Sequence, residues 1–203
     1  MLHVLDQAWG QTCQGLGTLV RFADDFLVLT STKARAEEAK ARIEAILAPL
    51  GLVLHPEKTK IVCLSKGQEG FTFLGFEHRM VESHRYKGRW YLNKWPSPRA
   101  MASIKDKVRQ RTTRSRASLP LGWVVEDLNP VLRGWANYYR VGNSSRKFGI
   151  VDSYVHLRLS KLASVKYGLR EWNRGSRFNY DWLTQLGIYR LTGKVRYPGT
   201  ASA

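Results

Sequence analysis

The chain has 203 residues, of which 43% are hydrophobic and 11% aromatic, and it carries a formal net charge of +17. This length and composition indicate a folded protein of one or two domains. With no run of about 18 apolar residues, a membrane-spanning helix is excluded, and the isolated Cys13 and Cys63 and scattered histidines argue against a zinc site. The first ten residues lack the basic and apolar regions of a signal peptide, so we expect a soluble protein in the reducing cytoplasm.

The charge is confined to one part of the sequence. Residues 1–76 contain eight Lys/Arg and eight Asp/Glu, whereas residues 77–203 contain twenty-five Lys/Arg, eight Asp/Glu and six of the seven Trp. Such a step predicts a domain boundary and a polyanionic partner for the second half, with nucleic acid as the first candidate. The alternative is a solvated basic face that serves only solubility.

The first half shows the pattern of a mixed helix and strand unit. Residues 1–9 carry apolar side chains at helical spacing, and residues 18–29 form two β-rich arms around a central Asp-Asp pair, as in a hairpin. Residues 33–48 predict a helix with the apolar stripe Ile43, Ile46, Leu47 and Leu50. Short strands are expected at residues 52–54, 60–64, 71–76 and 90–92.

The second half turns helical. Ser97-Pro98 predicts an N-cap followed by proline in the first turn of a helix with Met101, Ile104 and Val108 on its apolar face. Asn129-Pro130 repeats this signal and predicts the start of a second helix. A third helix is expected at about residues 149–166, with Ile150, Tyr154 and Leu157 on one stripe and Val151, Val155 and Leu162 beside it. Residues 179–203 show weak patterning and are expected to be extended.

Two adjacent acids, Asp24 and Asp25, stand at the centre of the predicted hairpin, between apolar residues that we expect to exclude water. Carboxylates in such a setting are costly unless a cation compensates their charge. Mg²⁺ is held by one or two carboxylates together with substrate phosphates, and paired metals clamp the reacting oxygens in phosphoryl transfer. Asp is also a favoured turn residue, so the pair by itself favours the polar turn of a surface hairpin over a metal site.

Order and spacing favour the metal-binding interpretation. Phe22-Ala-Asp-Asp25 is followed by the amphipathic helix, then by Lys58-Thr-Lys60 and by Phe73-Leu-Gly-Phe76. This run resembles the palm of reverse transcriptases. The resemblance implies that Asp24 and Asp25 are catalytic Mg²⁺ ligands and that Lys58 or Lys60 lies near the incoming nucleotide. It also implies a hairpin that grips the primer end, made by Phe73, Leu74, Gly75 and Phe76.

Two of these assignments have simpler readings from the residues alone. Lys58 and Lys60 equally fit an edge strand whose lysines discourage aggregation. The segment from Phe73 to Phe76 equally fits a core strand with Gly75 at a bulge.

The second half resembles the thumb, or X domain, that is specific to group II intron maturases. Its most distinctive segment is Leu-Asn-Pro-Val-Leu-Arg-Gly-Trp-Ala-Asn-Tyr-Tyr-Arg at residues 128–140, and residues 148–155 and 189–198 also fit. We expect Trp135 and Tyr138 to pack inside a helical bundle, whereas Tyr139 fits either packing or stacking on bases. The residues expected to meet phosphates and ribose hydroxyls of RNA are Arg109, Arg111, Arg114, Arg116, Arg133, Asn137, Arg140, Arg146 and Lys147.

Together these features predict an α+β protein. Residues 1–95 would form a partial polymerase palm of antiparallel strands and a helix, residues 96–170 a small three-helix thumb bundle, and residues 171–203 an extended tail. The implied function is that of a group II intron-encoded reverse transcriptase/maturase. Its partners would be intron RNA, an RNA template and a DNA primer, and no zinc endonuclease domain is evident.

The family needs a further carboxylate from an upstream palm strand, and no acid in this sequence matches that position, since Asp6 lies on the helix that leads into the hairpin. We therefore expect weak Mg²⁺ binding and no polymerisation by this chain alone. Two alternatives are an RNA-binding splicing cofactor without catalysis and a non-functional remnant of a mobile element. A third is a reverse transcriptase of another bacterial class, against which the Gly-Trp-Ala-Asn-Tyr-Tyr segment argues.

Overall fold

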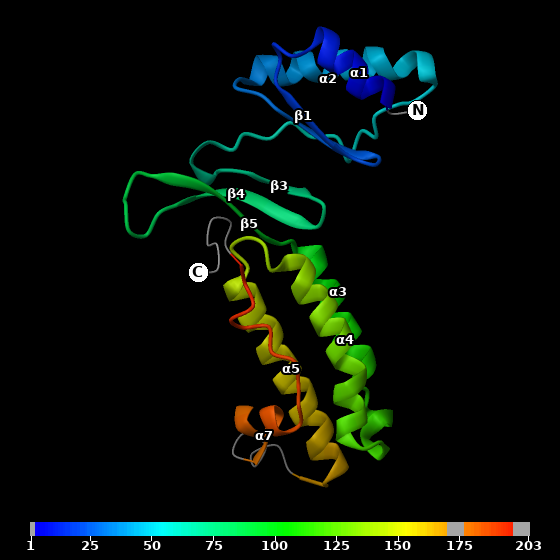
Figure 1. The fold of residues 1–203 in the computed structure, drawn as a ribbon, viewed down its shortest axis with the longest axis vertical. Coiled ribbons are helices and arrows are strands. Elements are labelled where there is room, and N and C mark those ends of the chain that lie inside the picture. The colour runs from blue at the N-terminus through cyan, green and yellow to red at the C-terminus, as the bar shows by residue number, and fades with distance from the viewer. Residues whose placement is uncertain (1–2, 170–176, 197–203) are drawn as a thin grey trace. The chain divides into compact units, whose positions relative to one another are not determined.

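The computed structural model describes residues 3–169 and 177–196 (Figure 1). It confirms the α+β class, with helices and small antiparallel sheets. The chain divides into two compact units. Unit 1 comprises Met1–Leu74 and Arg79–Tyr91, and unit 2 comprises Gly75–His78 and Leu92–Ala203.

Two helices and a hairpin form the core of unit 1. Its elements are α1 (His3–Thr12), β1 (Thr18–Phe22), β2 (Asp25–Leu29) and α2 (Lys33–Leu47). Helix α2 begins at Thr32, whose side chain accepts a hydrogen bond from the backbone N–H of Arg35 and so satisfies one of the free donors of the first turn. The buried residues of this core are Leu5, Trp9, Cys13, Ala39, Ile43 and Leu47. The predicted hairpin and both predicted helices are therefore confirmed.

The segment that follows α2 differs from the prediction. It contains the short 3-10 turns η1 (Ala48–Leu50) and η2 (Ser65–Gly67), and the strands predicted at residues 52–54 and 60–64 are absent from it. Leu52 and Leu54 still pack against the core of unit 1. The apolar alternation is thus explained by packing alone, because a strand also needs a hydrogen-bonded partner.

A second sheet has the order β3–β4–β5, and its strands are β3 (Gly70–Phe73), β4 (Phe76–Glu82) and β5 (Trp90–Pro96). The predicted continuous strand at residues 71–76 is interrupted, because the chain turns at Leu74-Gly75. The two residues have φ angles of 49° and 77°. Positive φ at both central positions is the signature of a tight hairpin turn whose twist matches that of its strands.

Unit 2 is built on three long helices, which Figure 1 shows running along one another. They are α3 (Pro98–Arg111), α4 (Leu121–Tyr139) and α5 (Ser145–Lys166), with the 3-10 helix η3 (Arg114–Ser118) between the first two and the short helix α7 (Tyr180–Gln185) after the third. Ser97 caps α3 through the backbone N–H of Ala100, and Met101, Ile104 and Val108 are buried, as predicted. Each fully buried Leu or Ile in such a core contributes about 1.5–3 kcal/mol.

Helix α4 begins nine residues before the predicted position, at Leu121, and Pro130 lies inside it. Asn129 is therefore no N-cap. Its side chain instead bonds the backbone of a distant segment: Nδ2 donates to the carbonyl of Gly187 at 2.9 Å, and Oδ1 accepts from the N–H of Tyr189 at 2.7 Å. The predicted cap was wrong because the pattern of Asn before Pro does not reveal partners almost sixty residues away.

Three further predictions for unit 2 need correction. On α5 the stripe of Val151, Val155 and Leu162 is buried, whereas Ile150 and Leu157 are exposed. Tyr138 is 53% exposed and does not fill the bundle, whereas Tyr139 is buried. The tail is not simply extended, because α7 forms and the core buries Phe178, Leu183, Ile188 and Leu191; the end of the tail, residues 197–203, lies outside the described residues.

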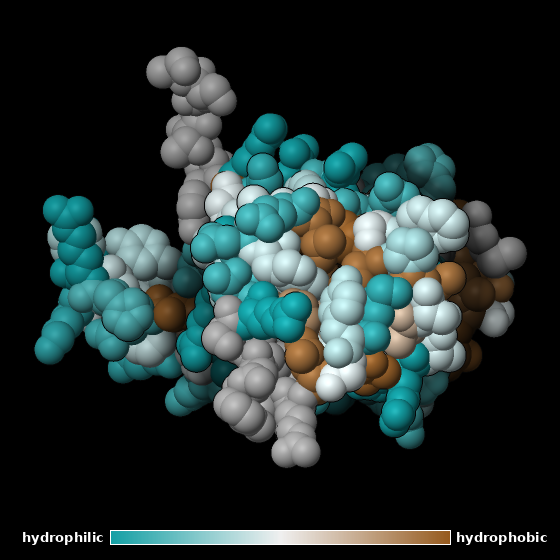
Figure 2. Space-filling view, turned by 90° about the horizontal axis from the view of Figure 1, so that it is seen from below, coloured by the Kyte–Doolittle hydropathy of each residue, from teal (hydrophilic) through white to brown (hydrophobic). Residues whose placement is uncertain are grey.

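In the parts of the chain that the structure describes, no helix is both long and apolar enough to cross a membrane. Figure 2 shows hydrophilic residues over much of the visible face, with hydrophobic residues between them.

Candidate metal hairpin and nucleic-acid interface

The acidic pair lies at the tip of the β1–β2 hairpin. The strands pair in antiparallel register from Thr18 opposite Leu29 to Phe22 opposite Asp25, which leaves Ala23 and Asp24 as a two-residue turn. Ala23 has a φ of 52°, an uncommon conformation for a residue with a side chain. Arg21 Nη1 donates to the Ala23 carbonyl at 2.7 Å and so supports the turn from outside.

Arg21 also fastens the hairpin to α1. Its Nε donates to Asp6 Oδ1 at 2.8 Å, and its Nη2 donates to Asp6 Oδ2, which makes a two-point contact. This hydrogen bonding holds the pKa of the Asp6 carboxyl below its usual value and raises the pKa of Arg21. Asp6 thus forms an ion pair within unit 1.

Asp24 and Asp25 are both exposed, and neither side chain has a hydrogen bond or ion pair with another described residue. The neighbouring Phe22 is 64% exposed, so the expected exclusion of water by the flanking residues is wrong. Within residues 3–169 and 177–196, no group of three or more His, Cys, Asp or Glu could hold a metal ion. Two adjacent carboxylates suit a Mg²⁺ ion whose other ligands are phosphates and water, and they do not suit a closed protein cage.

Lys58 and Lys60 lie in the loop after α2 and are exposed. The backbone N–H of Lys58 bonds the carbonyl of His55 in a turn at 3.2 Å. Because this loop contains no strand, the edge-strand interpretation is wrong. The structure provides no contact that ties either lysine to the acidic pair, and the nucleotide role of Lys58 stays a prediction.

The predicted primer grip forms the β3–β4 turn, on a sheet separate from β1–β2. Phe76 is buried, and its ring lies 4.9 Å from the ring of Tyr139 and 5.6 Å from that of Tyr138. Lys94 Nζ lies 5.4 Å from the centre of the Phe76 ring. The bulge interpretation of Gly75 is wrong because Gly75 is a turn residue, and the role of the segment toward a primer stays a prediction.

Three of the predicted RNA contacts lie on one face of α4. Arg133, Asn137 and Arg140 are spaced by four and three residues, which places them in a row on the helix surface. Arg133 and Asn137 are exposed, and Arg140 is partly exposed. Arg146 and Lys147 lie in the first turn of α5, with Arg146 exposed.

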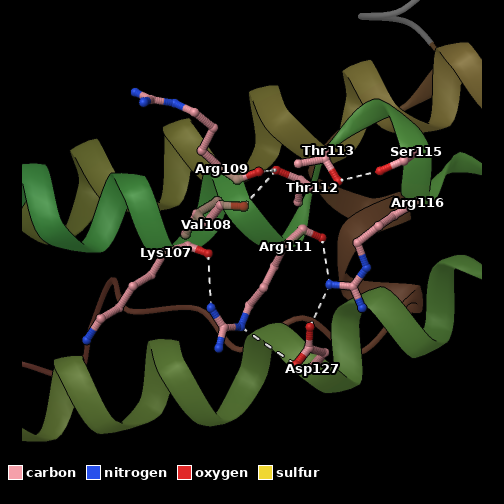
Figure 3. A network of polar contacts seen from close by, with 9 residues as sticks. All are labelled: Lys107, Val108, Arg109, Arg111, Thr112, Thr113, Ser115, Arg116 and Asp127. Atoms are coloured by element: carbon pink, nitrogen blue, oxygen red, sulfur yellow. Dashed lines mark hydrogen bonds and ion pairs between the residues drawn. The ribbon is translucent and has the colours of Figure 1, made fainter.

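The predicted contacts around the end of α3 fall into two groups. Figure 3 shows that Arg111 and Arg116 both point toward Asp127 of α4. Arg116 Nη1 bonds Asp127 Oδ2 at 2.6 Å, and Arg111 Nε lies 3.6 Å from Asp127 Oδ1. These two arginines join α3, η3 and α4 through one shared carboxylate, which balances one of their two positive charges. Arg109 points away from this network (Figure 3), beside Asp106 at 3.0 Å, and Arg114 is exposed.

Two family models match the chain. The model described as "Reverse transcriptase (RNA-dependent DNA polymerase)" matches residues 1–78. The model described as "Group II intron, maturase-specific domain" matches residues 101–178. The chain belongs to the group II intron reverse transcriptase/maturase family. No curated protein sequence matches it closely enough to count as a relative.

The two family matches separate the acidic hairpin from the basic helices. The reverse transcriptase match contains the acidic hairpin, in a family that generally uses Mg²⁺. The maturase-specific match contains the basic helices, in keeping with domains that bind nucleic acid.

The sequence did not reveal the basic residues that follow the maturase-specific match. Arg190, Lys194 and Arg196 are exposed on residues 187–196, a segment that unit 2 holds in place. Residues 189–198 are part of the maturase resemblance in the sequence, but their basic side chains were not assigned to RNA.

Proposed function

We propose that this chain binds structured group II intron RNA through the row of Arg133, Asn137 and Arg140 on α4, together with Arg146 and Lys147. The observation that supports this proposal best is the exposure of this row on a helix that the core of unit 2 holds rigidly. Arginine forks and an amide at helical spacing suit phosphates and ribose hydroxyls of an RNA backbone. We propose that Arg109 and Arg114 contact the same RNA at the end of α3, whereas Arg111 and Arg116 act mainly by holding Asp127.

The test is the affinity of the whole chain for a group II intron RNA at a series of salt concentrations. Replacing Arg133 and Arg140 by Gln should weaken binding on the order of tenfold. It should also lower the slope of log K against log salt by about 0.7–0.9 for each lost phosphate contact. A matched control is Lys33→Gln with Arg42→Gln, which removes the same charge from α2 of unit 1, where both side chains are largely exposed.

Equal losses in the two double variants would contradict the proposal and favour a chain that binds RNA only as any basic protein does. That result would support the interpretation as a non-functional remnant. If only the Arg133→Gln with Arg140→Gln variant loses RNA affinity, and substitution of Asp24 and Asp25 has no effect on it, a splicing cofactor without catalysis is favoured.

For the acidic hairpin we propose that Asp24 and Asp25 bind Mg²⁺ only when phosphates supply further ligands, and that this chain alone does not extend a DNA primer on an RNA template. The two exposed carboxylates, with no third acid beside them in the described residues, support this view. Primer extension with Mg²⁺ tests it directly. Robust extension that Asp24→Ala abolishes would overturn the second part of the proposal and confirm the first.

A further inference from the structure

Residues 187–196, here called the C-terminal strip, run back along the bundle after α7. Figure 1 shows this segment, coloured orange to red, beside α5. Its side chains divide into two sets. Ile188 and Leu191 are buried, while Arg190, Lys194 and Arg196 are exposed. The strip lies beyond residues 101–178, which the maturase-specific family model matches.

Helix α4 and the two residues that follow it hold the strip at both of its ends. Near the start, Asn129 bonds the Gly187 carbonyl and the Tyr189 N–H. At the end, the N–H of Arg196 donates to the Arg140 carbonyl at 2.7 Å, and a parallel bridge pairs Val141 with Arg196. The strip therefore follows α4 over about three turns of helix, beside the face that carries Arg133 and Arg140.

Helix α5 holds the middle of the strip through Asp152. This carboxylate is 8% exposed and accepts hydrogen bonds from the backbone N–H groups of Leu191 and Thr192, each at 2.9 Å, and from the Thr192 hydroxyl at 2.6 Å. Asp152 therefore binds the strip through both of its carboxylate oxygens. The strip is thus fixed from two helices by the side chains of Asn129 and Asp152.

The strip and α4 enclose a shallow hollow of about 530 Å³. Its lining includes three cationic side chains, Arg133, Arg190 and Lys194, and no carboxylate among the described residues. Arg133 Cζ lies 5.4 Å and Lys194 Nζ 6.0 Å from the centre of the Tyr189 ring. Rings that attract cations in this way position the charges without neutralising them.

We propose that the C-terminal strip and Arg133 form a second grip on the RNA backbone, with Arg190 and Lys194 binding phosphates. This inference rests on the proposed function, since it names additional contacts for the same RNA. Three unneutralised cations around one hollow favour a phosphate ligand. The Tyr189 ring lies against the Arg133 and Lys194 cations and so helps to position them. The strip recognises the backbone of RNA and not its sequence.

The experiment compares two double variants of the whole chain in RNA binding over a series of salt concentrations. Arg190→Gln with Lys194→Gln should weaken binding on the order of tenfold and lower the salt slope by about 0.7–0.9 per cation. The control, Arg99→Gln with Lys161→Gln, removes one exposed Arg and one exposed Lys from elsewhere in unit 2. This control variant should change the RNA affinity and the salt slope by only a small fraction of the changes expected for the strip variant.

Equal effects in the two double variants would overturn the assignment of the strip. If the strip variant binds normally while Arg133→Gln with Arg140→Gln weakens binding, the strip inference fails and the proposed function stands. If none of the variants affects binding, both fail.

Asn129 is a positioning residue in this proposal, and its role has a separate signature. Asn129→Ala should release the start of the strip and lower the salt slope, although it removes no charge. Its effect should add little to that of Arg190→Gln with Lys194→Gln, because both remove the same contact. Full additivity, or an unchanged slope, would contradict the positioning role.

Free nucleotides offer the same phosphate chemistry as RNA. Titration with a nucleoside triphosphate therefore forms the last arm of the experiment. We expect weak binding that short RNA displaces. Triphosphate binding as tight as that of RNA, and equally sensitive to Arg190→Gln with Lys194→Gln, would overturn the RNA assignment in favour of a free nucleotide.

Discussion

The Asp152 carboxylate has the clearest structural task of any single residue in the chain. It is nearly buried and accepts three hydrogen bonds from residues 191 and 192. Asp152→Ala would leave the buried N–H of Leu191 without a partner, at about 1–3 kcal/mol for each unsatisfied group. We expect the free energy of unfolding in urea to fall by about 2–4 kcal/mol. Asp106→Ala, which removes an exposed pair with Arg109, should change it by less than about 1 kcal/mol.

His78 gives a pH-dependent prediction. Burial is the main cause that lowers the pKa of His78, and the positive charge of Lys94 adds to it, while a backbone hydrogen bond at Phe76 opposes it. The folded protein therefore takes up this proton at lower pH than the unfolded chain, so stability is retained above about pH 6.5 and lost as pH falls below it. We expect urea unfolding to show a loss between about pH 7.5 and pH 5. His78→Gln should reduce this loss, and an equal loss in the variant would contradict the prediction.

Residues with local partners were predictable from the sequence. The Ser97 cap and the turn around Asp24-Asp25 depend on neighbours within three residues, and both formed as expected. The N-cap prediction for Asn129 was wrong because its partners, Gly187 and Tyr189, are distant in sequence. The contact of Arg116 with Asp127 was likewise missed, while its role toward RNA stays a prediction. The apolar residues beside the acidic pair also led us to expect too little solvent exposure there. The exposure of Phe22 depends on which face of the hairpin the core covers, and the sequence does not show this.

At the scale of elements, the geometry of the β3–β4 turn requires glycine at position 75. Gly75 has a φ of 77°, and a Cβ built there would lie 2.6 Å from the hydroxyl oxygen of Tyr139. Gly75→Ala therefore combines backbone strain with a clash against a buried ring, and we expect the free energy of unfolding to fall by about 2–4 kcal/mol.

A matched substitution separates these two causes. Gly168 has a similar φ of 64°, but no atom lies within 4 Å of a Cβ at that position. Gly168→Ala should cost about 1 kcal/mol from strain alone. If the two variants lose the same stability, the contact with Tyr139 carries no weight and the turn is limited only by its backbone.

Helices were predicted better than strands because an amphipathic stripe can be read within one element. The stripes of α2 and α3 were correct, and the first residue of α4 was wrong because Pro130 lies inside a helix that packing maintains. The predictions of strands at residues 52–54 and 60–64 were wrong, because apolar alternation does not reveal whether a partner strand is present.

On the scale of the whole molecule, the acids and the cations that matter lie in different units, so their effects on RNA binding should separate. Asp24 and Asp25 lie in unit 1, whereas Arg133 and Arg140 lie in unit 2, whose residues carry +14 of the net charge of +17. Asp24→Asn with Asp25→Asn removes two negative charges at an exposed tip and disturbs no described hydrogen bond of these side chains. RNA affinity in the presence of a chelator should therefore stay unchanged or rise slightly, with the same salt slope.

Any gain in affinity that Mg²⁺ gives to the unmodified chain should instead shrink in this acidic-pair variant, because the carboxylates contribute only when an ion bridges them to phosphate. Binding assays with chelator and with Mg²⁺, at equal ionic strength, measure both effects on one RNA. The Arg133→Gln with Arg140→Gln variant serves as the reciprocal control and should lose affinity under both conditions. Loss of RNA affinity by the acidic-pair variant in chelator would mean that the hairpin contacts RNA without an ion, and the separation of the two chemistries would fail.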